Sequence, residues 1–122
     1  MDGQRSVLIV DESEETREVL QTALERRGMR TFAAGQAHRG LELARRHHPD
    51  LIVLDMEIED AGSEGLFAPL AEESPNDGPR LVLLGTVSRT RQPPLHGEFV
   101  AKPYHYAPLI RRIEQLLETA KR

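Results

Sequence analysis

Polar side chains follow the short apolar runs in this sequence, at the first few positions beyond each run. The runs are Val7–Val10, Leu51–Leu54, Leu81–Leu84 and Phe99–Ala101, and the residues that follow them are Asp11-Glu12, Asp55-Met56-Glu57, Gly85-Thr86 and Lys102-Pro103. If the runs are parallel strands of one sheet, their carboxyl ends lie at a single rim, where such sheets bind ligands. The acidic groups, one hydroxyl and one ammonium would then meet at that rim.

This set of side chains is typical of phosphoryl chemistry assisted by a cation. Clustered carboxylates repel one another unless a divalent cation lies among them, and oxygen ligands without imidazole or thiolate favour Mg²⁺. One carboxylate can then attack phosphorus and form an acyl phosphate. Lys102 is one of only two lysines in the chain. Its compact ammonium suits a single phosphoryl oxygen, whereas arginine prefers planar, bidentate partners.

The apolar runs predict buried strands separated by helices. Short continuous runs of Val, Ile and Leu suit strands that are covered on both faces. An apolar pattern at helical spacing starts after Ser13, a good N-cap residue, and ends at Gly28. Met29–Ala34 then predicts a weaker edge strand. A second helix, carrying Ala37, Leu41 and Ala44, is expected to end at His47-His48-Pro49.

The second half of the chain continues this alternation with less regular segments. A short apolar helix is expected around Leu66, Phe67 and Leu70, whereas Pro93-Pro94 leaves little helix between Ser88 and Gly97. The last helix is clear from its apolar stripe, which consists of Leu109, Ile110, Ile113, Leu116, Leu117 and Ala120. Alternating strands and helices predict right-handed crossovers and an open parallel sheet.

Composition excludes several classes of protein. The 122 residues suit one domain, which we expect to span residues 1–122, and the lack of cysteine excludes disulfides and thiolate metal sites. The net charge of −4 and the scattered basic residues argue against a nucleic-acid surface. The apolar runs are too short for a membrane span, and the N-terminus lacks the layout of a signal peptide. We therefore expect a cytoplasmic domain that binds neither nucleic acid nor membrane.

Taken in order, these motifs resemble the response regulator receiver family of two-component signalling. The resemblance rests on Val7–Val10 with Asp11-Glu12, on Leu51–Leu54 with Asp55, on Lys102-Pro103, and on Arg17 and Pro49-Asp50. It covers essentially the whole chain. It implies an α/β fold, a flavodoxin-like doubly wound sheet of five parallel strands in the order 2-1-3-4-5. The fourth helix of this (βα)5 arrangement would be short or irregular here.

The resemblance also implies roles for individual residues. Asp55 would accept a phosphoryl group from a sensor histidine kinase or a phosphotransfer protein, and Lys102 would contact that group. Mg²⁺ would be held by Asp11, Glu12, Asp55 and the backbone carbonyl of Glu57. A hydroxyl after the fourth strand and the aromatic ring of Phe99 would form the switch that acts on an output domain or a downstream protein. The Lys102–Pro103 bond is expected to be cis, as in the family.

Three features depart from the family pattern. Glu12 stands where a second Asp is usual, and the loop after Asp55 is longer and more acidic than is typical. We expect the Glu57 side chain to point outward while its carbonyl points into the site. The switch hydroxyl is ambiguous, because one alignment places Gly85 there and the other places Thr86. Thr86 is preferred because Gly85 has no side chain.

Other functions remain open at this point. A degenerate receiver would bind a partner without phosphorylation. A small phosphatase with an aspartyl nucleophile would need a general acid, and Glu57 stands two residues after Asp55, where such enzymes place one. The pair His47-His48 is expected at a helix surface and not at a metal. Tyr104 and Tyr106 would either pack half-buried or contact a partner.

Overall fold

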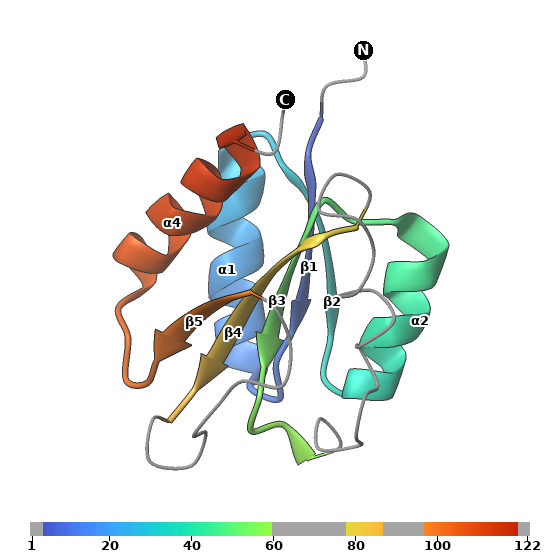
Figure 1. Cartoon of the computed structure of the whole chain (residues 1–122), viewed down its shortest axis with the longest axis vertical. Coiled ribbons are helices and arrows are strands. Elements are labelled where there is room, and N and C mark those ends of the chain that lie inside the picture. The colour runs from blue at the N-terminus through green and yellow to red at the C-terminus, as the bar shows by residue number, and fades with distance from the viewer. Residues whose placement is uncertain (1–3, 60–77, 87–96, 120–122) are drawn as a thin grey trace.

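The computed structural model describes residues 4–59, 78–86 and 97–119, in which five strands form one parallel sheet (Figure 1). The strands are β1 (Ser6–Val10), β2 (Arg30–Ala34), β3 (Leu51–Asp55), β4 (Arg80–Gly85) and β5 (Glu98–Ala101). Their order is β2-β1-β3-β4-β5, and every pair is parallel. The predicted fold class and strand order are therefore confirmed, as is the edge position of β2.

Helices cover both faces of this sheet in the described part of the chain. They are α1 (Glu14–Arg26), α2 (Ala37–His47) and α4 (Tyr106–Thr119). In Figure 1, α1 and α4 lie on one side of the sheet and α2 lies on the other. The helix predicted around Leu66, Phe67 and Leu70, the segment 88–96 and Ala120 lie outside the described residues. None of these three helices has the length and apolar content that a membrane span requires.

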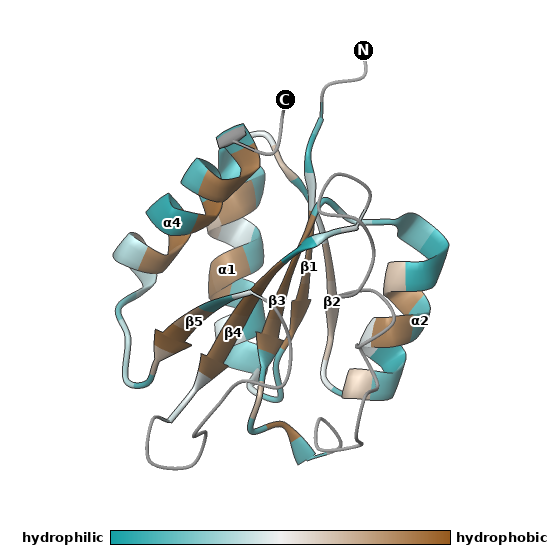
Figure 2. Ribbon diagram, in the orientation of Figure 1, coloured by the Kyte–Doolittle hydropathy of each residue, from teal (hydrophilic) through white to brown (hydrophobic). Residues whose placement is uncertain are grey.

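Alternate residues of the central strands pack into two separate apolar cores, one on each face of the sheet. On the α1 and α4 face, the strand residues are Val7, Ile9, Leu51, Val53, Val82 and Leu84. On the α2 face, they are Leu8, Val10, Ile52, Leu54, Leu81 and Leu83. All twelve residues are buried, which explains why the sequence shows continuous apolar runs instead of alternation. Figure 2 shows the result as apolar strands between helices whose outer surfaces are hydrophilic.

Local chemistry sets the helix ends as the sequence predicts. The Ser13 hydroxyl accepts a hydrogen bond of 3.1 Å from the Thr16 amide and thereby caps α1. Beyond α1, Gly28 adopts a φ of 85°, a left-handed conformation that suits glycine at a helix C-terminus. His48 ends α2 with a φ of 49°, and its amide donates to the Ala44 carbonyl. The surface position predicted for His47-His48 is confirmed for His48, which is exposed, but not for His47, which is half-buried with its ring stacked on Phe32.

The amino ends of three strands are fastened by Asp50. Its carboxylate accepts a 2.8 Å hydrogen bond from the Ser6 amide at the start of β1, and its own amide donates to the Ser6 carbonyl. The Asp50 carbonyl accepts from the Arg80 amide at the start of β4, over 3.0 Å. Asp50 is thus a structural residue at the end of the sheet opposite to the acidic rim.

Candidate functional site

The side chains at the rim are positioned by strand ladders that continue one residue past the strands. The Asp11 amide donates to the Ala34 carbonyl over 3.0 Å, and the Lys102 amide donates to the Gly85 carbonyl over 2.8 Å. Asp55 is the last residue of β3 and is paired with Leu84. Alternation along the strands directs Asp11, Asp55 and Lys102 toward the same face, the one covered by α1 and α4. The structure therefore brings together the acidic and basic residues that the sequence placed at one rim.

The Lys102 ammonium forms an ion pair with Asp55. Its Nζ atom lies 2.9 Å from Asp55 Oδ1, and the two side chains are 27% and 7% exposed, respectively. Burial opposes the charged ammonium, but the hydrogen bond that Lys102 donates to Asp55 and the charges of Asp55 and Glu57 outweigh it and raise the pKa of Lys102. Lys102 is therefore a fixed cation beside the carboxylate that is predicted to accept the phosphoryl group.

Asp11 is a second buried carboxylate at the rim, with 4% of its surface exposed. Burial raises its pKa, the hydrogen bond from the Ser13 amide opposes this rise, and the negative charge of Asp55 adds to it. That hydrogen bond to Asp11 Oδ1 is 2.9 Å long. Two neighbouring carboxylates in a buried setting make the rim favourable for a cation beyond the one that Lys102 supplies.

Arg17 fixes the backbone that carries Asp11. Its guanidinium donates to the carbonyl of Asp11 over 2.7 Å and to the carbonyl of Glu12 over 3.2 Å. Gly35 makes room for this side chain, because a Cβ atom there would lie 2.9 Å from Arg17 Nη1. Arg17 therefore links the loop after β1 to the loop after β2, and it acts through the backbone and not on a ligand.

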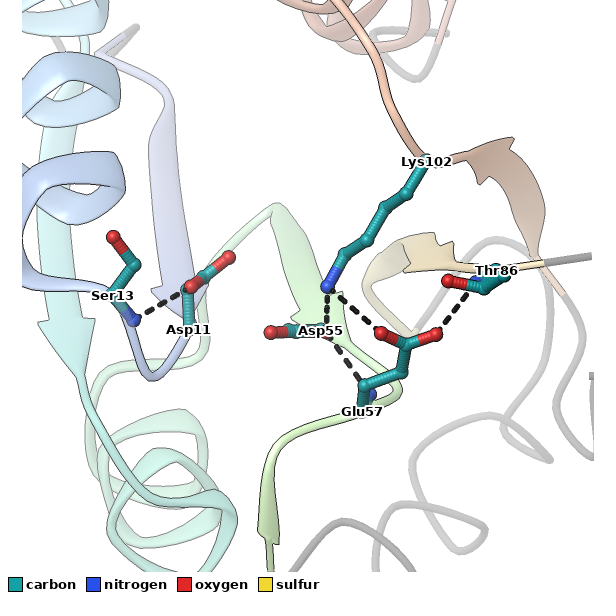
Figure 3. A network of polar contacts seen from close by, with 6 residues as sticks. All are labelled: Asp11, Ser13, Asp55, Glu57, Thr86 and Lys102. Carbon is teal, nitrogen blue, oxygen red and sulfur yellow. Dashed lines mark hydrogen bonds and ion pairs between the residues drawn. The ribbon is translucent and has the colours of Figure 1, made fainter. Parts of the chain in front are cut away.

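The prediction for Glu57 is wrong: its side chain points into the site. Oε2 accepts a 2.8 Å hydrogen bond from the Thr86 amide, and Oε1 lies 3.4 Å from Lys102 Nζ (Figure 3). The turn that allows this is closed by the Glu57 amide, which donates to Asp55 Oδ1 over 3.0 Å. Hydrogen bonds from the hydroxyl and the amide of Thr86, together with Lys102, lower the pKa of Glu57. The carboxylate of Glu57 is thus ionised, and it accepts hydrogen bonds from Thr86 and Lys102.

The predicted magnesium ligands are only partly assembled. Asp11 and Asp55 lie at the rim, whereas the Glu12 side chain is exposed and only its carbonyl is held, by Arg17. Within residues 4–59, 78–86 and 97–119, no three acidic or histidine side chains form a group that could hold a metal ion. Mg²⁺ usually needs only one or two carboxylates and keeps several waters, so the buried pair Asp11 and Asp55 fits it. The contributions of Glu12 and of the Glu57 carbonyl stay predictions.

Sheet register bears on the ambiguous switch hydroxyl. Gly85, paired with Ala101, continues the alternation of Leu81 and Leu83 on the face where Phe99 packs against the α2 core. Thr86 lies one position further, and its amide is directed to Glu57. Gly85 rather than Thr86 therefore follows the alternation onto the Phe99 face. The switch roles of Thr86 and Phe99 stay predictions.

An open groove borders the ion pair of Lys102 and Asp55. Its volume is about 570 Å³, and its lining residues are Thr16, Thr86, Lys102, Pro103, Tyr104 and Tyr106. The Lys102–Pro103 bond is cis, as predicted. The two tyrosine rings meet edge to face with centroids 5.9 Å apart, and both pack half-buried against the α1 and α4 core. Burial raises the pKa of Tyr104 to about 12, so its phenol is neutral.

Comparisons with known proteins are consistent with this arrangement. A family model described as the response regulator receiver domain matches residues 7–91. Over 55 residues the chain is 47% identical to the KDP operon transcriptional regulatory protein KdpE of Escherichia coli, a match that covers 45% of this chain and 24% of KdpE. It is 29% identical to the probable transcriptional regulatory protein TcrX of Mycobacterium tuberculosis over 123 residues, which cover 95% of this chain and 51% of TcrX.

Solved structures share the fold. The receiver domain of Francisella response regulator 1452 matches with a TM-score of 0.80 at 21% identity, over 97% of this chain and 100% of that chain. The receiver domain of TorR, the response regulator of the TMAO respiratory system, matches with a TM-score of 0.81 at 21% identity, over 96% of this chain and 99% of that chain. The chain spans about half of TcrX and about a quarter of KdpE.

Proposed function

Because this chain belongs to the response regulator receiver family, we propose that it is a phosphorylation switch in which Asp55 accepts the phosphoryl group. The observation that carries the proposal is the ion pair of Asp55 and Lys102 beside the buried Asp11. A carboxylate at a sheet rim, next to a fixed cation, can attack phosphorus and have the added charge offset. The donor would be a sensor histidine kinase or a phosphotransfer protein.

The hydrogen bonds of Asp55 indicate which oxygen reacts. Among the described residues, both hydrogen bonds to this carboxylate end on Oδ1, from Lys102 Nζ and from the Glu57 amide. Oδ2 is thus the oxygen that would attack. A new O–P bond forms while the N–P bond of the donor's phosphohistidine breaks. The imidazole nitrogen keeps the electron pair and takes a proton from solvent, so the carboxylate needs no general base.

The remaining rim residues would orient Asp55 and offset the negative charge of the phosphoryl group. Lys102 holds Asp55 in place and would contact one phosphoryl oxygen. Asp11 and Asp55, with Glu12 and the Glu57 carbonyl as further ligands, would hold Mg²⁺, which when bound offsets negative charge on the phosphoryl oxygens. Arg17 keeps Asp11 in position through its backbone. The groove beside Lys102 offers a route by which a donor side chain can reach the rim.

Output from this domain would follow a change in a two-state equilibrium. The phosphoryl group adds roughly −1.5 to −2 charge, and contacts that form only with it favour the active conformation. KdpE and TcrX are described as transcriptional regulatory proteins and are longer than this chain. We place the domain in the cytoplasm, where it would act on a downstream protein or an output domain without contacting nucleic acid itself.

Two rival functions make different predictions. The phosphatase reading needs Glu57 as a general acid, and a general acid works best with a raised pKa. The lowered pKa of Glu57 counts against that role. A degenerate receiver would keep the fold and bind its partner without phosphorylation. Its support lies in Gly85, which leaves the end of β4 without a hydroxyl on the face where Phe99 lies.

Phosphoryl uptake from a small acyl phosphate tests the proposal. Incubation with acetyl phosphate and Mg²⁺ should add one phosphoryl mass to the intact protein. Asp55→Asn and a sample with chelated metal should add none. If the wild-type chain gains no mass and also gives no response to beryllofluoride with Mg²⁺, the degenerate receiver becomes the better description.

A further inference from the structure

The carboxylate of Glu57 bridges two donors that come from different parts of the chain. Oε2 accepts from the Thr86 amide, just after β4, and Oε1 faces the Lys102 ammonium, just after β5. Figure 3 shows Glu57 lying between the two, beside Asp55. The two carboxylate oxygens thus face donors from two different strand ends, and the bridge joins the carboxyl ends of β3, β4 and β5.

These donors are of the kind that holds an oxyanion. An ammonium and a backbone amide that converge from neighbouring strand ends bind anionic oxygens through charge-assisted hydrogen bonds. Lys102 Nζ is also 2.9 Å from Asp55 Oδ1, so a phosphoryl group on Asp55 would lie within reach of this ammonium. The Glu57 carboxylate therefore lies where oxygens of that group would be bound.

The Glu57 carboxylate and a phosphoryl group cannot share these donors without cost. Both are anionic, and like charges at contact distance repel strongly in a site that is partly screened from water. Glu57 can leave, because its side chain is 23% exposed at the rim and has rotatable bonds that can carry it to solvent. The site can therefore exchange an internal anion for an external one.

We propose that Glu57 is an internal occupant of the phosphoryl-binding donors, which must be displaced before Lys102 and the Thr86 amide can hold a phosphoryl group. The inference deepens the proposed function and rests on it. Glu57 then affects both the rate of phosphorylation and the choice of phosphodonor, because it slows phosphoryl transfer from small anionic donors. Donors that position the phosphoryl group through other contacts would overcome it more readily.

Three variants separate this role from a general effect of charge. Glu57→Gln removes the charge and keeps an acceptor oxygen, whereas Glu57→Ala removes both. Glu59→Gln is the matched control, because Glu59 lies in the same loop, is exposed, and loses the same charge on substitution. Urea unfolding of each variant reports whether the fold is intact before binding is compared.

The first readout is beryllofluoride binding with Mg²⁺, and the second is the rate of phosphoryl uptake from acetyl phosphate. Glu57→Gln and Glu57→Ala should each bind more tightly and react faster than wild type by about tenfold, the effect of removing one nearby like charge. Glu59→Gln should stay within about twofold, since exposed charges are screened. Equal behaviour of Glu57→Gln and Glu59→Gln, or slower uptake by folded Glu57 variants, would overturn the inference.

A binding measurement that needs neither metal nor phosphoryl transfer tests this inference separately from the proposed function. The Thr86 amide resonance is followed while inorganic phosphate is added to the metal-free protein. Phosphate should shift this resonance in Glu57→Ala at concentrations that leave wild type and Glu59→Gln unchanged. If no chain accepts a phosphoryl group but this difference is seen, the acceptor function fails and the occupancy by Glu57 stands. If phosphate shifts Thr86 equally in all chains, the occupancy is refuted.

Discussion

The ammonium of Lys102 lies 2.9 Å from Asp55 Oδ1, although the two residues are 47 positions apart in the sequence. The parallel ladder between β3, β4 and β5 produces this contact, because it brings the residues after each strand to one rim. The pair is partly buried, so its loss should be felt both in charge and in stability.

Replacing Lys102 should change the titration of Asp11. The positive charge of Lys102 lowers the pKa of Asp11, so Lys102→Met should raise that pKa further. It should also cost about 1–3 kcal/mol of stability at neutral pH, because Asp55 is left buried without its cation. Lys102→Arg keeps the charge and serves as the control. Carboxyl ¹³C titration and urea unfolding measure the two effects, and an unchanged Asp11 pKa in Lys102→Met would contradict the prediction.

Asp11→Asn should stabilise the metal-free protein. The pKa of Asp11 is raised in the folded state, so the folded state disfavours the charged form and loses stability as pH rises from the unfolded-state pKa. Asn removes the charge and keeps an oxygen that can accept from the Ser13 amide. We expect a gain of about 1 kcal/mol at neutral pH. The gain should shrink as pH falls through 3.8, the ordinary pKa of this carboxyl, because Asp11 is protonated in both states only well below that pH. Urea unfolding across this range, without Mg²⁺, would refute the idea if the variant were less stable at neutral pH.

The cap of α1 should be measurable as a local contribution. Ser13→Ala removes the 3.1 Å hydrogen bond to the Thr16 amide and should cost about 1 kcal/mol in unfolding free energy. Ser13→Thr keeps a hydroxyl and should cost less than half as much. A Ser13→Ala variant as stable as wild type would mean that water replaces the cap without loss.

Gly40 should resist substitution even though it lies inside α2. A Cβ at this position would lie 2.6 Å from Val10 Cγ2, in the fully buried core. Alanine improves helix propensity by about 1 kcal/mol, but overpacking costs about 1–3 kcal/mol, so Gly40→Ala should be net destabilising.

A second substitution tests the cause of that loss. In a Val10→Ala background the opposing methyl is gone, and Gly40→Ala should become neutral or stabilising. Thermal unfolding of the four chains gives the coupling between the two sites. Additive effects would show that the contact between Gly40 and Val10 is not what limits the helix.

Much of the fold could be predicted from the sequence because buried parallel strands leave a strong pattern. The runs Val7–Val10, Leu51–Leu54 and Leu81–Leu84 are apolar on both faces, and the acidic and basic residues stand directly after them. Asp11, Asp55 and Lys102 were therefore placed correctly relative to one another. The N-terminal end of α1 was also predictable, because Ser13 is a good N-cap residue.

The orientation of Glu57 was not predictable in the same way. Its direction depends on Thr86 and Lys102, which lie 29 and 45 positions away, and on a turn closed by Asp55. The position two residues after Asp55 and the length of a glutamate were the only signals available. Choosing between Gly85 and Thr86 likewise required the register of β4 and β5, which no local pattern contains.

Because alternate residues of β3 point to opposite faces of the sheet, the direction of each side chain depends on the number of residues that precede it in the strand. Inserting or deleting one residue within Leu51–Leu54 would turn the Asp55 carboxylate to the α2 face and exchange strand side chains between the two cores. Insertions or deletions beyond Ile58 do not change which face each side chain of β3 points to. Natural variation in this protein should therefore place insertions after Ile58, while β3 itself accepts substitutions but no insertions or deletions.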